Sequence, residues 1–122
     1  LAIWDTYHQW ARKHEDAGLL RRPFVPEHCT HNAHMYYMLL PSLEYRTKFI
    51  DALRNRGVQT VFHYIPLHSS PAGMNCGRTH SSMEVTNRIS EQLVRMPLWL
   101  GLEPQMDELI HNADEAIKEA FA

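Results

Sequence analysis

The most informative segment of the chain is residues 61–73, which read Val-Phe-His-Tyr-Ile-Pro-Leu-His-Ser-Ser-Pro-Ala-Gly. Its first residues are β-branched or aromatic, which favours a strand, and Pro66 ends that strand. Functional side chains gather where a rigid element passes into a loop. This position marks His63, Tyr64 and His68 as candidates for a site. A structural interpretation, with Tyr64 in the core and His63 in solvent, fits the residues equally well.

Outward from this segment, hydrophobic periodicity predicts helices that alternate with short strands. A Ser42 cap precedes one helix, and the capping-box pattern Ser81-Ser82-Met83-Glu84 opens another. The predicted elements are a helix over 1–18, a strand over 34–40, a helix over 43–56, a strand over 58–64, a long loop over 65–80, a helix from 81 to about 94, a short strand at 96–98 and a last helix from 104. The order predicts one α+β domain over residues 1–122, a sheet of two or three strands covered by about four helices.

The apolar faces of these helices are regular. The first helix presents Ile3, Trp4, Tyr7, Trp10, Ala11 and His14; the second presents Tyr45, Phe49, Ile50 and Leu53; the last presents Met106, Leu109, Ile110, Ala113, Ile117, Ala120 and Phe121. Bulky apolar residues exceed what a small core needs. We therefore predict that some of them stay exposed for a partner, the candidates being Trp4, Trp10, Leu98, Trp99 and Leu100.

Composition excludes several function classes. The net charge is −2 with nine histidines taken as neutral, so no basic stripe for nucleic acid is present. No apolar run approaches the ~20 residues that span a bilayer, and we expect no membrane partner. Cys29 and Cys76 are too few and too far apart for a disulfide framework, which favours free thiols in a reducing cytoplasm. Nucleophile-elbow, Walker and dinucleotide motifs are missing.

Three histidines, at positions 28, 31 and 34, are spaced three apart with Cys29 between the first two. On a helix this spacing would place imidazoles on one face and could hold zinc. Pro26 precedes them, however, and His34 lies in a β-like run, where a spacing of three alternates faces. We therefore expect solvated loop histidines and no metal, and keep a histidine-based metal site as the weaker alternative.

Four motifs carry a resemblance to a known family: Asn32-Ala33-His34-Met35-Tyr36, Val61-Phe62-His63-Tyr64-Ile65-Pro66-Leu67-His68, Pro71-Ala72-Gly73 and Arg95-Met96-Pro97-Leu98-Trp99. Through them, residues from about 31 to 116 resemble the C-terminal part of DegT/DnrJ/StrS-type sugar-nucleotide aminotransferases, pyridoxal-phosphate (PLP) enzymes of fold type I. The likeness is greatest to the transaminases that make dTDP-4-amino-4,6-dideoxygalactose for enterobacterial common antigen. Residues 74–82 depart from that subgroup's pattern.

The resemblance implies a homodimeric cytoplasmic enzyme that moves an amino group from glutamate to C4 of a dTDP-4-keto-6-deoxy sugar. It also implies that the Schiff-base lysine lies in a large N-terminal domain outside this chain, with residues 1–18 as the connecting helix. The chain alone is then expected to hold no catalytic residue, to bind no PLP and to be inactive. His34, His63, Tyr64 and His68 fall on motif positions near the cleft between the domains, which makes them candidate substrate-binding residues. The alternative is a stand-alone binding or interaction module without catalysis.

Overall fold

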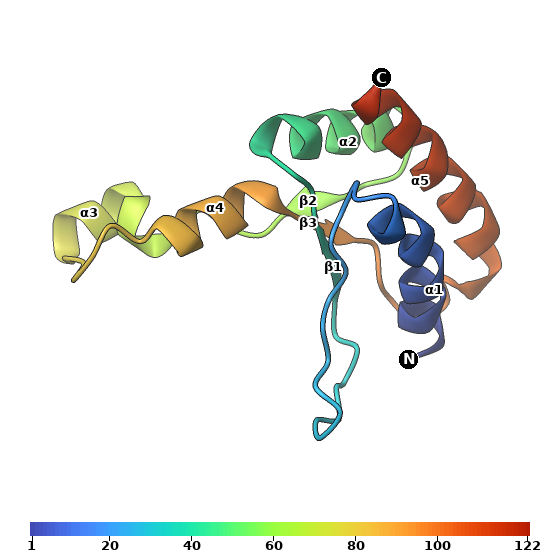
Figure 1. Cartoon of the computed structure of the whole chain (residues 1–122), viewed down its shortest axis with the longest axis horizontal. Helices are drawn as coiled ribbons and strands as arrows, with labels where there is room; N and C mark the ends of the chain where they lie inside the picture. The colour runs from blue at the N-terminus through green and yellow to red at the C-terminus, as the bar shows by residue number, and fades with distance from the viewer.

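The computed structural model describes residues 1–122, built around a three-stranded antiparallel sheet (Figure 1). The strands are β1 (Tyr36–Leu39), β2 (Val61–Phe62) and β3 (Leu93–Met96), in the spatial order β1-β3-β2. Strand β3 is central: Tyr36 pairs with Met96 on one side, and Phe62 pairs with Val94 on the other. The predicted α+β class and small sheet are confirmed.

Three amphipathic helices cover one face of this sheet: α1 (Ala2–Asp16), α2 (Leu43–Asn55) and α5 (Met106–Phe121). A 3-10 turn, η2 (Glu103–Gln105), leads into α5. Helix α2 begins as the sequence predicts, because the Ser42 hydroxyl accepts a hydrogen bond from the Tyr45 amide. The side chains that these helices turn inward form one core of 23 buried residues with the inner face of the sheet.

The core absorbs two of the tryptophans that we expected to be exposed. Trp4 and Trp10 are buried, because α1 is itself a covering helix of the sheet. The expectation of an exposed apolar face on the first helix is therefore wrong. Trp99 and Leu100 follow β3 in a turn and are exposed, as predicted.

Asp114 joins α1 to α5. Its carboxylate accepts hydrogen bonds from the Trp10 indole at 2.7 Å and from the Lys13 ammonium at 2.8 Å, and it lies 2.8 Å from His14 Nε2. Three partners from one helix thus meet a single group of the other. These polar contacts, together with the apolar packing between α1 and α5, hold the two helices side by side.

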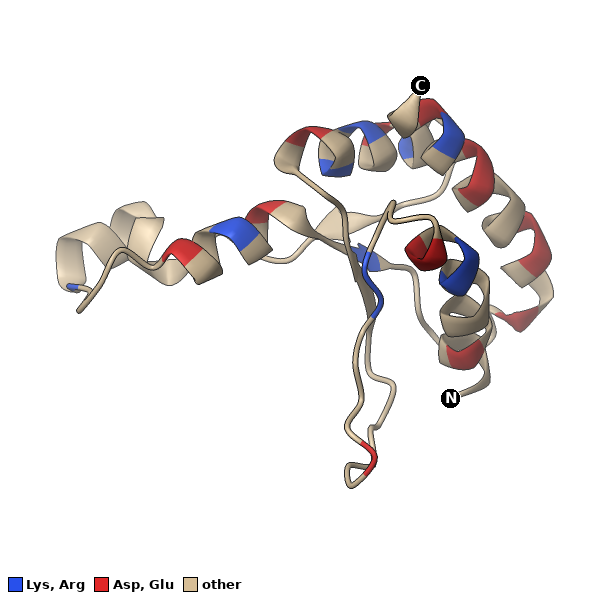
Figure 2. Ribbon diagram, in the orientation of Figure 1, with Lys and Arg blue, Asp and Glu red and all other residues tan.

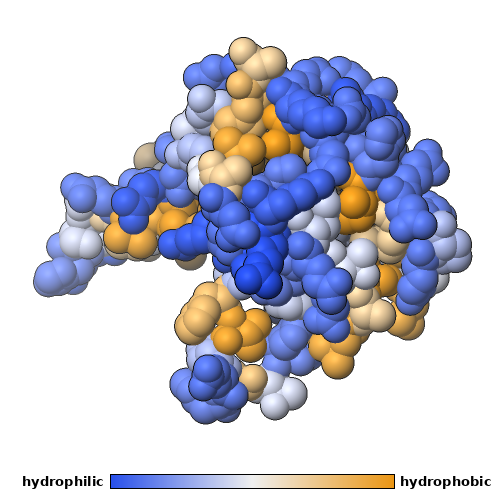
Figure 3. Space-filling view, turned by 45° about the vertical axis from the view of Figure 1, so that its right-hand side comes forward, coloured by the Kyte–Doolittle hydropathy of each residue, from blue (hydrophilic) through white to orange (hydrophobic).

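Residues 65–92 project from the body of the molecule and are called the arm here (Figure 1). The arm holds η1 (Leu67–Ser69), α3 (Pro71–Cys76) and α4 (Glu84–Gln92), and none of these elements has a buried residue. The space-filling view shows apolar atoms gathered on it (Figure 3). Figure 2 shows that α3 carries no charge.

The predicted loop over residues 65–80 is wrong, since η1 and α3 lie within it. The local signal is present: the Ser70 hydroxyl accepts from the Gly73 amide, and Pro71 occupies the first turn. Gly73 is required because a Cβ there would overlap the Leu67 carbonyl oxygen. Pro71 and Gly73, which in the sequence indicate a loop, are therefore part of the short helix α3.

The junction of α4 and β3 also differs from the prediction. Met83, in the left-handed region at φ 55°, precedes α4 and makes no side-chain cap, so the predicted capping box does not form. Helix α4 ends at Gln92 instead of near residue 94, and β3 begins at the next residue, Leu93. The strand expected at 96–98 lies at 93–96, because pairing with β1 and β2 fixes its register. Strand β2 is shorter than predicted, because Pro97 of the partner segment has no N–H to extend the ladder before Val61, and Tyr64, with a φ of 45°, leaves the β geometry after Phe62.

Candidate functional site

The sheet has one face that no helix of the core covers. Alternation along β3 buries Val94 and Met96 in the core and turns Arg95 to the other face. Arg95 pairs with Tyr37 on one neighbouring strand and with Val61 on the other. An arginine thus lies in the middle of the open face, beside the strand end that the sequence marks as a site.

Tyr64 interrupts the strand geometry at that end. Its φ of 45° is a left-handed conformation, which costs a non-glycine residue roughly 1–2 kcal/mol. The turn breaks the alternation and places the tyrosine ring over Arg95, whose guanidinium carbon is 5.7 Å from the ring centroid. The His63 ring lies edge-on to Tyr64, with centroids 5.0 Å apart. Tyr64 is 71% exposed, so it does not pack in the core and its other face is available.

A second arginine lies behind the same strand end. Arg46 of α2 has its guanidinium carbon 5.3 Å from the centroid of the Phe62 ring and donates to the Ser90 carbonyl at 2.8 Å. Burial lowers the pKa of Arg46, with Glu91 acting in the opposite direction. A hollow of ≈ 390 Å³ lies here, lined by Arg46, Phe62, Tyr64, Ile65, Pro66, Ser69, Asn87, Ser90 and Glu91.

Three nitrogen atoms around this strand end are shielded and have no hydrogen-bond partner: His63 Nδ1, Arg46 Nε and Arg95 Nε. Neither arginine has a carboxylate within 4.0 Å, whereas most other cations of the domain are paired. An unpaired, shielded donor is unfavourable unless a partner is supplied. The site therefore combines two arginines that have no carboxylate partner with an exposed aromatic ring, which suits a ligand with an anionic group and a planar group.

His68 belongs to the same region. It lies in η1, and its Nε2 is 2.7 Å from Asn87 Oδ1 on α4. This contact fixes the imidazole orientation and ties the first turn of the arm to its second helix. His63 and Tyr64 are thus brought together at the end of β2, whereas His68 borders the site through Asn87, which lines the hollow.

His34 lies elsewhere. It precedes β1 beyond the Met96 end of the sheet, whereas His63 follows β2 at the Leu93 end. At about 3.3 Å per residue, these two ends of β3 are about 10 Å apart, and His34 lies two residues beyond the Tyr36 end of β1. His34 Nδ1 is 2.9 Å from Asn32 Oδ1 on its own segment.

Sequence reasoning missed Arg46, Arg95 and Asn87 as members of the site. Arg95 stood inside a quoted motif, and its place as the charged residue of an otherwise apolar strand was a usable signal. Arg46 and Asn87 lie on helices distant in sequence and carry no local signal.

The three evenly spaced histidines do not converge. His31 packs against Trp4, with ring centroids 4.4 Å apart, and His34 contacts Asn32. The chain holds no group of three or more His, Cys, Asp or Glu side chains placed to bind a metal ion. Cys29 and Cys76 are free and exposed. No helix has both the length and the apolar character needed to cross a membrane.

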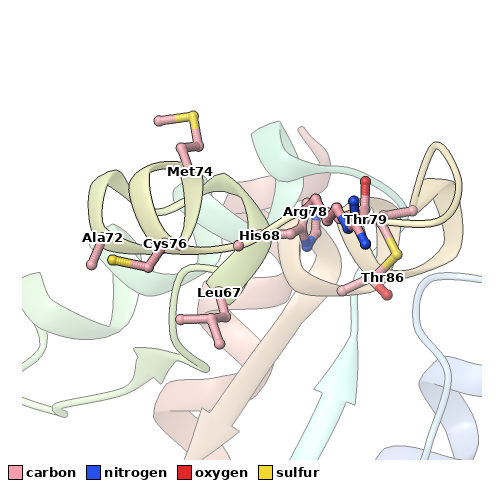
Figure 4. A pocket seen from close by; sticks show the side chains of 11 residues that line it. Leu67, His68, Ala72, Met74, Cys76, Arg78, Thr79 and Thr86 are labelled. Carbon is pink, nitrogen blue, oxygen red and sulfur yellow. The ribbon is translucent and has the colours of Figure 1, made fainter.

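A larger cavity of ≈ 780 Å³ lies within the arm, between η1, α3 and α4 (Figure 4). Among the candidates only His68 lines it. In the close view His68 lies beside Arg78 and Thr79, while Met74 points away from them.

Known proteins share both the sequence pattern and the fold of this chain. A sequence model described as the DegT/DnrJ/EryC1/StrS aminotransferase family matches residues 2–113. The chain belongs to the DegT/DnrJ/EryC1/StrS aminotransferase family. The matched region contains the whole sheet, all the helices up to the middle of α5, and every candidate residue named above.

Solved structures agree with this family fold. The aminotransferase TlmJ from Streptoalloteichus hindustanus superposes with a TM-score of 0.80 at 21% identity, over 98% of this chain and 32% of its own. DesV from S. venezuelae, solved with a ketimine intermediate, gives 0.78 at 23% identity, over 96% and 30%. NtdA from Bacillus subtilis, solved with the cofactor PMP, gives 0.76 at 22%, over 95% and 27%. This family member thus spans about a third of the length of these aminotransferases.

The lysines of the domain do not fit the covalent attachment of PLP. Lys13 pairs with Asp114, Lys48 with Glu44 and Lys118 with Glu115, and all three ammonium groups lie in exposed side chains on helices. A Schiff-base lysine needs a desolvated, unpaired amine. We therefore derive no catalytic step through the cofactor from these residues.

Proposed function

We propose that the chain is the C-terminal domain of a longer, PLP-dependent aminotransferase that transfers an amino group from glutamate to C4 of a dTDP-4-keto-6-deoxy sugar. The product is dTDP-4-amino-4,6-dideoxygalactose, a precursor for enterobacterial common antigen. Residues 1–18 connect to the large domain, which supplies PLP and its lysine. PLP provides the electron sink for amino transfer, and the protein supplies binding and orientation.

The observation that carries this proposal is the grouping of Arg95, His63 and Tyr64 at the end of β2 in a member of an aminotransferase family. A nucleotide sugar brings a diphosphate and a planar base. The Arg95 guanidinium has no carboxylate within 4.0 Å, so its positive charge suits the diphosphate, and the His63 ring lies beside it against Tyr64. The exposed Tyr64 ring offers a stacking surface for the base or the sugar.

His68 and His34 have separate roles in this proposal. His68, oriented by the contact of its Nε2 with Asn87 Oδ1, approaches the site from the arm and accepts a hydrogen bond from a sugar hydroxyl at Nδ1. His34 lies toward the other end of the sheet and contacts a different part of the extended substrate. All four residues bind substrate, and none is the catalytic base.

The proposal includes a homodimer in the cytoplasm. Exposed apolar side chains of the arm, among them Leu67, Met74 and Val85, support a partner surface there. The two free, exposed thiols suit a reducing compartment.

The test begins with the native polypeptide that carries this domain. Its intact mass establishes whether a large domain is present, and incubation with PLP, glutamate and dTDP-4-keto-6-deoxyglucose is followed by mass spectrometry for the amino sugar. We expect turnover, and NMR assigns the configuration at C4. A matched UDP-linked keto sugar tests the nucleotide preference. A native chain that ends at these 122 residues and does not turn over would favour the stand-alone binding module instead.

A further inference from the structure

A third cavity lies at the β1 edge of the sheet, whereas the hollow of the candidate site lies at the end of β2. It has a volume of ≈ 600 Å³ and is formed by α1, by the connection that follows it and by β1, the edge strand farthest from β2. Its lining residues are Trp4, His8, Glu15, Arg21, Arg22, Pro23, Phe24, Val25, His31 and Tyr37. None of the residues assigned to the substrate site lines it.

Charge in this cavity is not balanced. The Glu15 carboxylate is fully engaged by Arg22, accepting from its backbone amide and from its Nε at 2.7 Å each. Arg22 also donates from Nη1 to the His8 carbonyl at 2.8 Å, so its guanidinium is held in place. Arg21 has no carboxylate within 4.0 Å and is exposed. Its backbone is nevertheless fixed, because it forms an antiparallel bridge with Leu39. A free cation therefore stands at the cavity on a rigid support.

Two imidazoles line the same cavity and are held by one indole. His8 stacks on Trp4, with ring centroids 4.6 Å apart and planes at 20°, and His31 packs on it at 4.4 Å. Burial, and then the charge of Arg22, lower the pKa of His8, while Glu15 and Asp5 act in the opposite direction and His31 lowers it further. An added anion would remove part of this penalty and would favour the protonated imidazole.

An apolar wall stands beside these groups. Pro23, Phe24 and Val25 follow the two arginines directly, and Phe24 is 83% exposed. A large aromatic side chain left in solvent next to a cationic cavity offers contact area to the carbon part of a ligand.

We propose that this cavity binds a phosphorylated small molecule, with its phosphate at Arg21, His8 and His31 and its carbon skeleton against Phe24. A phosphate monoester has three acceptor oxygens and a charge near −2 at neutral pH, which matches one free guanidinium and two imidazoles. The cavity shares no lining residue with the proposed nucleotide-sugar site, whose Arg95, His63 and Tyr64 lie at the end of β2.

Binding of phenyl phosphate to the 122-residue chain, measured by calorimetry at low salt, tests the proposal. We expect saturable binding that weakens about tenfold or more in Arg21→Gln, the loss typical of a charged hydrogen bond. Phe24→Ala is expected to weaken phenyl phosphate but not inorganic phosphate. Arg12→Gln is the matched control, because Arg12 is an exposed arginine of α1 outside the cavity. Benzoate tests whether the anion must be a phosphate.

A second readout is the NMR titration of the histidine ring protons. The proposal expects phenyl phosphate to shift the His8 and His31 resonances and to raise the pKa of His8, with His68 and His111 unaffected. Absence of saturable binding, equal binding by Arg21→Gln and Arg12→Gln, or equal affinity for benzoate would each overturn it. Circular dichroism of each variant establishes that the fold is retained.

Discussion

The guanidinium carbon of Arg95 lies 5.7 Å from the centroid of the Tyr64 ring. The contact joins the middle of the central strand to the first residue that leaves the β geometry. It exists because Tyr64 has a φ of 45°, a conformation that its side chain does not favour. A residue kept in such a conformation while its ring stays exposed contributes little to folding, which points to a role in binding.

Replacing Tyr64 with glycine tests this separation of stability from function. Glycine adopts the positive φ without penalty, and the exposed ring buries little area. We expect the free energy of unfolding, measured with urea, to stay within about 1 kcal/mol of the wild type or to rise. Tyr37→Gly, in regular strand β1, is the matched control and should lose about 1 kcal/mol or more. Equal losses in the two variants would contradict the strain at Tyr64.

Asp114→Asn should weaken the contact between α1 and α5. The variant weakens three contacts, to Trp10, Lys13 and His14, at a half-buried position. We expect a loss of about 1–3 kcal/mol in the free energy of unfolding. Asp16→Asn, an exposed acid of α1, serves as the control and should be near neutral. If both variants unfold at the same urea concentration, Asp114 does not join the helices.

The same carboxylate gives a pH dependence of known sign. Burial raises the pKa of Asp114, but the hydrogen bonds from Lys13, Trp10 and His14 outweigh it, and the net pKa is lowered from 3.8. A group with a lowered folded-state pKa stabilises the fold above its unfolded pKa, and this stability is lost as pH falls through the folded value. We therefore expect stability to decline below about pH 4. Asp114→Asn should lose less between pH 5 and pH 3, in urea unfolding at both values, than the wild type does.

The sequence predicted those parts of the fold that local periodicity determines. Neighbouring residues alone determine the apolar faces of α1, α2 and α5 and the Ser42 cap, so these features could be predicted from the sequence. The start of β3 at Leu93 could not be predicted from the sequence. Helix α4 passes into β3 without a turn, and only the pairing with β1 and β2 favours a strand there. Helix α3 was missed because proline and glycine signal loops and short helices alike.

The candidate site was predictable in the same partial way. His63, Tyr64 and His68 were predicted because a strand end and a family motif mark them. Arg46 and Asn87 could not be found, because only the packing of α2 and α4 brings them to the end of β2. His34 shares a motif with the family but lies toward the other end of the sheet, a separation that only the strand register reveals.

Gly73→Ala should unfold the tip of the arm while the core stays folded. A Cβ at this position would overlap the Leu67 carbonyl oxygen, and overpacking of this kind costs about 1–3 kcal/mol. Helix α3 buries no residue, so it has little stability to lose. Hydrogen exchange should show loss of protection over residues 70–77 with unchanged protection in α5. Met74→Ala, at an exposed position of the same helix, should leave both regions protected.

The most direct test of the central proposal is kcat/KM for the dTDP-4-keto-6-deoxy sugar in the intact aminotransferase that carries this domain. Arg95→Gln, His63→Ala and Tyr64→Phe are compared with Arg12→Gln, an exposed arginine remote from the end of β2. Removing one interaction with a charged or buried group costs about 1–3 kcal/mol. The account therefore predicts a fall in kcat/KM of about fivefold to a hundredfold in Arg95→Gln and His63→Ala, a smaller fall in Tyr64→Phe, normal PLP content in every variant and no change in the control. Wild-type kcat/KM in all three site variants would contradict it.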